Sequence, residues 1–304
     1  ACRWMPPARN PPTPPVTVPA IMGGRKRTGG AGLDPVHVHI KSLAHGGDGV
    51  ATLPDGRTVF VAGACPGDEV DIELTASHDR WAKARIVTLR VASADRVQPR
   101  CPYFGVCGGC QWQHVIYDVQ LSAKRQALVD ALERIGGLTE PPVAEAVASP
   151  SAYGYRNKIE LTAGSEPGGT VFGFTRAGSR DLVRIGECHL LPDATRTLPK
   201  ALAGALRFST SRGASGVLRA TLRVSRDGEV SVDLWSAGGP FPRAAVARVV
   251  KESTGASTVT RVIVRGDLKT RDVSKVEVLA GPGAWTETLG RDRFLVSAPS
   301  FFQV

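Results

Sequence analysis

Three cysteines stand close together in the segment CPYFGVCGGCQWQH, residues 101–114. They are Cys101, Cys107 and Cys110, and their spacing is C-x5-C-x2-C. Thiolates grouped in this way bind zinc or iron–sulfur clusters, but three of them do not complete the usual set of four ligands. The candidate for the fourth ligand is Cys188, which stands in the later segment IGECHLLP.

Spacing alone leaves three kinds of chemistry open for these cysteines. A structural zinc site usually takes two C-x2-C pairs, or one such pair with a histidine pair, and His114 and His189 are not spaced as a pair. An iron–sulfur cluster accepts three close thiolates and a distant fourth, so it is the favoured interpretation. Zinc and a thiol–disulfide pair at Cys107 and Cys110 are the alternatives. For Cys188, the alternative is an inert buried thiol.

Composition and charge limit the class of protein. The chain of 304 residues is long enough for two or three domains, and 42% hydrophobic residues are typical of a protein with a buried core. Its net charge of +10 favours polyanions such as nucleic acid, although a solvated basic surface would also explain it. We find no secretory signal and no apolar run of membrane-spanning length. The six cysteines, three of them clustered, suit a reducing cytoplasm, where such groups bind metal more often than they form disulfides. We predict a cytoplasmic protein with no membrane contact, and we expect a monomer.

The first third of the chain contains a tail and a set of short strands. Residues 1–33 are rich in Pro and Gly and predict a disordered basic tail, with Met22 as an alternative start. Over residues 34–93, five short strands with alternating apolar residues predict a small OB-like barrel. Such barrels often bind single-stranded nucleic acid. We interpret Cys65, inside this region, as a small core residue.

Residues 94–292 mix helical and strand patterns. Apolar residues at helical spacing predict a helix from Asp118 to about Ile135, which Gly136 ends. Further helices are expected over 193–207 and about 242–252, among several strands. The pattern predicts an α+β central domain.

Two long segments resemble one known family. SLAHGGDGVATLPDGRTVFVAGACPGDEV resembles the TRAM domain, an RNA-binding barrel. CPYFGVCGGCQWQHVIYDVQLSAKRQALVDALERIGGL closely resembles the cluster segment of bacterial 23S rRNA (uracil-5-)-methyltransferases. In that family a C-x5-C-x2-C group and one distant cysteine hold a [4Fe–4S] cluster. The resemblance covers about residues 36–304, and it implies that Cys101, Cys107, Cys110 and Cys188 hold a cluster that pins the segment 101–114 onto the central domain.

The resemblance also implies roles for residues outside the cysteine group. YRNKIEL resembles the family's Tyr-Arg-x-Lys strand, which implies that Arg156 and Lys158 face RNA, although a solvated strand face is an equal alternative. FLVSAPSFFQV resembles the segment that leads into the methyltransferase domain. It implies that Gln303 contacts S-adenosylmethionine and that Phe301 stacks near a flipped base. For Phe302 we favour a core position.

The expected fold class follows from these matches. It is an OB-like TRAM barrel over 34–93, an α+β central domain over 94–292, and the start of a Rossmann-like methyltransferase domain over 293–304, truncated at the C-terminus. The family's nucleophilic cysteine and general base would lie beyond Val304. The resemblance therefore implies an inactive part of an enzyme, which contributes no catalytic residue of its own.

The complete enzyme would form 5-methyluridine in 23S rRNA. A cysteine thiolate would add to C6 of a uracil flipped out of single-stranded or looped RNA, and C5 would then take the methyl group of S-adenosylmethionine. A tRNA uracil-54 methyltransferase is the alternative for the substrate. A stand-alone iron–sulfur RNA-binding protein and a zinc-stapled RNA-binding module are the alternatives without catalysis.

Overall fold

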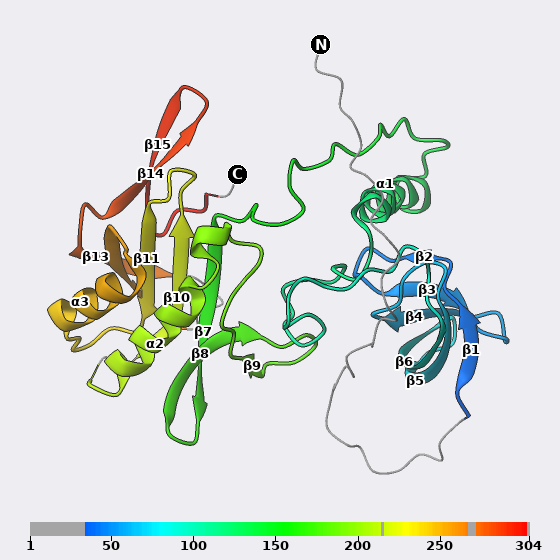
Figure 1. The fold of residues 1–304 in the computed structure, drawn as a ribbon, viewed down its shortest axis with the longest axis horizontal. Helices are drawn as coiled ribbons and strands as arrows, with labels where there is room; N and C mark the ends of the chain where they lie inside the picture. The colour runs from blue at the N-terminus through cyan, green and yellow to red at the C-terminus, as the bar shows by residue number, and fades with distance from the viewer. Residues whose placement is uncertain (1–33, 214–215, 267–271, 303–304) are drawn as a thin grey trace. The chain divides into compact units, whose positions relative to one another are not determined.

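The computed structural model describes residues 34–213, 216–266 and 272–302. The tail predicted over residues 1–33 lies outside these ranges. The described residues form two compact units, which Figure 1 shows from blue to green and from green to red. Residues 34–105 and 110–149 belong to the first unit, and residues 106–109 and 150–302 belong to the second.

The first unit is built on a six-stranded sheet with the order β1-β5-β6-β4-β3-β2 (Figure 1). β4 and β6 pair in parallel, and the other neighbours are antiparallel. Alternate residues point into a common apolar core, as Val59 and Val61 of β4 do. The sequence predicted five strands, the first over VHVHIKSL, and the structure divides that run into β1 and the very short β2. The strands are β1 (Val36–His39), β2 (Ser42–Leu43), β3 (Gly49–Thr52), β4 (Thr58–Ala62), β5 (Glu69–Ser77) and β6 (Trp81–Val91).

The residues that follow Cys110 pack against this sheet. The indole Nε1 of Trp112 donates a hydrogen bond to the carbonyl oxygen of Gly47 at 3.1 Å. Val115 is buried in a small apolar cluster with Leu43 and Cys65 of the barrel region. Helix α1 (Tyr117–Arg134) follows directly, close to the bounds that the apolar spacing predicted.

The second unit is built on a seven-stranded sheet with the order β13-β12-β11-β10-β7-β8-β9. Only β11 and β12 pair in parallel. Helix α2 (Leu198–Thr210) packs on β8, and α3 (Arg243–Thr254) packs on α2, β12 and β13. The remaining elements are β7 (Lys158–Glu166), β8 (Gly169–Thr175), β9 (Leu182–Val183), η1 (Asp193–Thr195), β10 (Val217–Val224), β11 (Val230–Ser236), β12 (Thr258–Val264) and β13 (Val273–Ala280).

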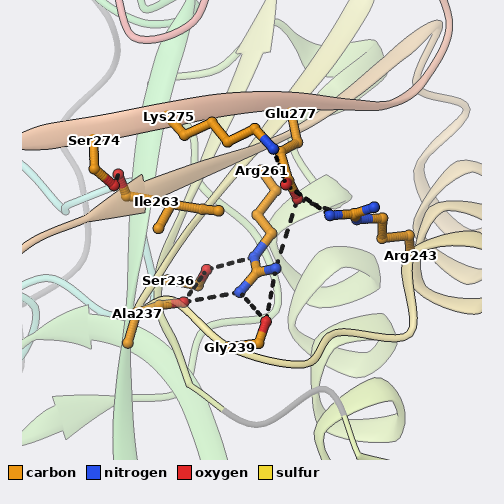
Figure 2. Close-up of polar contacts among 9 residues, drawn as sticks. All are labelled: Ser236, Ala237, Gly239, Arg243, Arg261, Ile263, Ser274, Lys275 and Glu277. Carbon is orange, nitrogen blue, oxygen red and sulfur yellow. Dashed lines mark hydrogen bonds and ion pairs between the residues drawn. The ribbon is translucent and has the colours of Figure 1, made fainter.

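A buried arginine fixes the connection between β11 and α3 on the helix-bearing face of the sheet. The Arg261 side chain is 3% exposed, and it donates hydrogen bonds to the carbonyl oxygens of Ala237 and Gly239 (Figure 2). Glu277 on β13 forms ion pairs with both Arg261 and Arg243, the first residue of α3. The network holds the start of α3 against the sheet.

The last described strands contradict the expected start of a Rossmann-like domain over 293–304. β14 (Ala284–Leu289) and β15 (Asp292–Ser297) form a two-stranded antiparallel hairpin. A Rossmann-like domain would instead open with a strand inside a mostly parallel sheet. The apolar run FLVS belongs to β15 and pairs with β14, the strand that directly precedes it. Gly290, with φ of 62°, occupies the turn between them.

Candidate functional site

One face of the second sheet carries charged and polar side chains. Because side chains alternate along a strand, Thr260 lies on the face opposite Arg261 and α3. The strand register continues this row from Thr260 through Asp233 and Thr221 to Glu160 on β7. We call this surface the polar face, and it also contains Lys158, Arg219 and Arg223.

Lys158 and Phe301 meet on the polar face. The Lys158 Nζ lies 5.4 Å from the centroid of the Phe301 ring, within the range of a cation–π contact. The Lys158 side chain is only 12% exposed and also pairs with Glu160 at 3.0 Å, whereas Phe301 is 73% exposed. The ring is therefore available to stack on a planar ligand, with a positive charge held near it.

A buried ion pair lies beside this contact. Arg223 is opposite Lys158 in the strand register, and its Nε is 3.3 Å from an oxygen of Asp233. Both side chains are 2% exposed, and Asp233 also accepts a hydrogen bond from the Thr260 hydroxyl at 2.7 Å. Burial raises the pKa of the Asp233 carboxyl above its ordinary value, opposed by the hydrogen bond from Thr260 and by Arg223. Sequence analysis did not single out Arg223 or Asp233.

A second surface of interest lies on the barrel of the first unit. The rings of His78 and Trp81 stack with their centroids 3.9 Å apart, and Phe60 meets Trp81 edge-on at 6.2 Å. The parallel register of β4 and β6 places Lys83 beside Phe60. Aromatic rings next to basic side chains are the usual elements of a single-strand binding surface. In the sequence, the segment WAKAR shows an aromatic residue followed by alternating basic residues, but the sequence analysis named no aromatic residue of this surface.

The predicted cluster ligands are divided between the two units. Cys101 and Cys110 belong to the first, and Cys107 and Cys188 belong to the second. The backbone N–H of Cys101 donates to the Gln113 side chain at 3.1 Å, which fixes the beginning of the loop. Cys188 is buried, and it lies in the connection that leads from β9 to η1 along the chain.

The residue types fit a [4Fe–4S] cluster, because four cysteine thiolates are its usual ligands. Yet across residues 34–213, 216–266 and 272–302, no group of three or more His, Cys, Asp or Glu side chains is arranged to hold a metal ion. The ligand set therefore stays a prediction.

The other predicted residues are placed as follows. Arg156 precedes β7, and its backbone N–H donates to the carbonyl of Leu190 at 2.8 Å. Its contact with RNA stays a prediction. Gln303 lies outside the described residues. Cys65 is fully buried, and burial raises the pKa of its thiol to about 11, as suits a core residue. In the part of the chain that the structure describes, no helix has the length and apolarity needed to cross a membrane.

The barrel has a family match of its own. Residues 35–87, which run from the start of the sheet into β6, match the model of the TRAM domain. This chain carries a TRAM domain. The prediction of that domain from the segment SLAHGGDGVATLPDGRTVFVAGACPGDEV is thereby confirmed.

Most of the chain is similar to RNA methyltransferases. An uncharacterized RNA methyltransferase of Thermosynechococcus vestitus is 34% identical over 278 residues, which are 88% of this chain and 61% of the relative. Another, of Halalkalibacterium halodurans, is 31% identical over 280 residues, or 89% of this chain and 61% of the relative. The chain thus spans about three fifths of the length of these relatives.

A solved structure shares the fold. The crystal structure of Pyrococcus abyssi tRNA (uracil-54, C5)-methyltransferase in complex with S-adenosyl-L-homocysteine matches with a TM-score of 0.61. The match is 22% identical in sequence and covers 88% of this chain and 61% of that one.

These matches complete the correction of the expected fold class. The similarity to an RNA methyltransferase and to the solved structure covers 88% of this chain in each case. Where the sequence predicted the beginning of a Rossmann-like domain, the structure has the second strand of the hairpin β14–β15. The fold class that included a truncated methyltransferase domain was therefore wrong. The chain contains a TRAM domain followed by a unit whose fold is shared with part of a methyltransferase.

Proposed function

We propose that this protein takes part in S-adenosylmethionine-dependent methylation of RNA at C5 of uracil. The observation that carries the proposal is the contact between Lys158 and Phe301 on the polar face. An exposed ring held against a positive charge suits stacking on an extruded base. The similarity of 88% of the chain to an RNA methyltransferase supports methylation of RNA, and the activity named for the Pyrococcus abyssi enzyme favours C5 of uracil.

RNA would contact the protein at two surfaces. On the TRAM domain, the rings of Phe60, His78 and Trp81 would stack with bases of a single-stranded segment. On the second unit, Phe301 would stack on the target uracil or its neighbour. A monomeric state and a cytoplasmic location stay predictions.

The chemistry requires a thiolate that adds to C6 of uracil and, after methyl transfer to C5, a base that removes the C5 proton so that the thiolate is expelled from C6. S-adenosylmethionine supplies the methyl group when bound, and Gln303 is the residue of this chain predicted to contact it. Lys158 and Phe301 contribute binding and orientation of the base. Neither is the nucleophile, because the reaction uses a thiolate.

We also propose that Cys101, Cys107, Cys110 and Cys188 hold a [4Fe–4S] cluster with a structural or RNA-orienting role. The donor set supports it, because four cysteine thiolates are the usual ligands of such a cluster. Zinc bound by the same thiolates is the alternative. Iron, sulfide and zinc analysis after anaerobic purification distinguishes the two.

The proposed substrate is 23S rRNA, because the cysteine segment resembles that of the rRNA enzymes. Uracil 54 of tRNA is the second candidate, favoured by the substrate named for the Pyrococcus abyssi enzyme. The test uses the protein expressed from its natural gene, labelled S-adenosylmethionine, and 23S rRNA or tRNA lacking the modification. Mass spectrometry of nuclease fragments should find 5-methyluridine in rRNA. Label in tRNA alone would support the second candidate, and absence of 5-methyluridine from both RNAs would contradict the proposed activity.

A further inference from the structure

A buried arginine side chain binds the backbone next to Phe301. The Arg223 Nη2 donates a hydrogen bond to the carbonyl oxygen of Ser300 at 2.6 Å. Ser300 directly precedes Phe301, so this bond restrains the residue whose ring lies over Lys158. A charged donor makes the bond stronger than an ordinary one between neutral groups.

Arg223 is itself held in one orientation. Its Nε faces Asp233 at 3.3 Å, and Asp233 accepts the Thr260 hydroxyl at 2.7 Å. The Nε and Nη2 of a guanidinium share one edge, so a single planar group connects Asp233 with Ser300. A lysine has no such fork and could not make both contacts in the same geometry.

The flanking residues are anchored by apolar contacts. Ala298 packs against the buried cluster of Trp235, Val262 and Val264. Phe302 lies against Trp285, with ring centroids 6.0 Å apart. These contacts hold both sides of the segment, and the Arg223 bond fixes the residue next to Phe301.

Buried ion pairs are often no more stabilising than apolar side chains of similar size. Stability alone therefore gives a weak account of Arg223 and Asp233 in this core. The bond to Ser300 gives a more specific one. We infer that Arg223 is a positioning residue, which holds the Ser300 carbonyl so that the Phe301 ring is presented for stacking on an RNA base. This inference rests on the proposed role of Phe301 in RNA binding.

The variants are chosen to separate positioning from folding. Arg223→Met combined with Asp233→Leu replaces the ion pair with apolar side chains and leaves no unpaired buried charge. Arg223→Lys keeps the charge and loses the fork. The matched control is Arg261→Met, which removes another buried arginine that holds backbone carbonyls, on the opposite face of the sheet.

The first measurement needs no RNA. 4-Fluorophenylalanine placed at position 301 reports the environment of the ring by fluorine NMR. We expect the resonance in both Arg223 variants to move toward the value of a mobile ring that is no longer held at Lys158, and to stay unchanged in Arg261→Met. An unchanged resonance in the Arg223 variants would overturn the positioning role.

The second measurement is affinity for a uridine-containing oligonucleotide, read by fluorescence anisotropy. Phe301→Ala should weaken binding about tenfold, a typical loss for one base–aromatic stack. The double Arg223/Asp233 variant should show a similar loss, and combining it with Phe301→Ala should add little further loss. Additive losses would overturn the inference. If Phe301→Ala leaves affinity unchanged while the resonance still moves, the proposed role of Phe301 in RNA binding is what fails.

Discussion

Trp112 donates a hydrogen bond from its indole Nε1 to the carbonyl oxygen of Gly47, 3.1 Å away. This contact attaches the residues after Cys110 to the TRAM domain. A ring nitrogen of His114 makes a second attachment, 3.2 Å from the carbonyl oxygen of Ala64. Both contacts come from the side chains of QWQH, so this part of the cysteine segment has a docking role that requires no metal.

Gly47 should tolerate no side chain at this contact. Its φ is 102°, and an added Cβ would lie 2.6 Å from the Cβ of Gln111. Gly47→Ala should lower the free energy of unfolding by roughly 1–3 kcal/mol, the usual range for a strained backbone position. Gly46→Ala is the matched control, because its Cβ would meet nothing within 4 Å. Urea unfolding of the two variants tests this, and equal stabilities would contradict the close packing of Gln111.

His114 should make the stability of the TRAM-containing unit depend on pH. Burial lowers the pKa of His114 from 6.5 to about 4. Below pH 6.5 the unfolded chain therefore binds a proton that the folded unit does not accept. Stability from this residue is complete above pH 6.5 and is lost as the pH falls toward 4, by roughly 3 kcal/mol in total.

Denaturant unfolding at several pH values measures this loss. His114→Gln keeps a donor for the Ala64 carbonyl and cannot titrate, so its stability curve should be flatter between pH 6.5 and 4. His45→Gln, at an exposed position, should keep the slope of the parent protein. If His114→Gln has that same slope, another group causes the pH dependence.

Lys158 should support Phe301 rather than bind phosphate directly. Its ammonium group is largely buried and already paired with Glu160. Lys158→Met should therefore weaken RNA binding while leaving the dependence of log Kd on log salt concentration unchanged. Lys83→Met, at an exposed position on the TRAM barrel, should reduce the magnitude of that slope by close to one, because one phosphate contact and its released counterion are lost. A reduced slope for Lys158→Met would show instead that Lys158 contacts a phosphate.

The aromatic surface of the TRAM domain should contribute to RNA affinity by stacking. Removing Trp81 eliminates its contacts with both His78 and Phe60. Trp81→Ala should weaken binding of a single-stranded oligonucleotide about tenfold, with little change between uridine and cytidine tracts. Val87→Ala, an exposed apolar residue on the same strand, is the control. The stacking role is wrong if both variants bind as the parent does.

Several elements could be predicted because local periodicity determines them. Helix α1 was located to within one residue at each end from the spacing of Leu121, Leu128 and Leu132. The hairpin β14–β15 was missed because an apolar run such as FLVS does not reveal which strand will pair with it. Resemblance to a longer family then suggested the wrong partner.

The candidate site was only partly accessible from the sequence. Motifs selected Lys158 and Phe301 separately, but their contact depends on how the last residues cross the sheet. Arg223 and Asp233 belong to strands that otherwise read as core. In the hairpin VLRATLRVSRDGEVSVDLW, the two residues are charged positions among apolar ones. Such positions indicate a buried ion pair only once the register of the two strands is known.

The cysteine ligand set can be tested one residue at a time. If the four predicted cysteines hold a [4Fe–4S] cluster, anaerobically purified protein should contain close to four iron and four sulfide per chain. Cys188→Ser should lose most of this iron, because a missing thiolate opens one corner of the cluster. Cys65→Ala should retain it, since Cys65 is a core residue whose buried thiol stays protonated. Zinc in place of iron, or equal iron in the two variants, would contradict the predicted cluster.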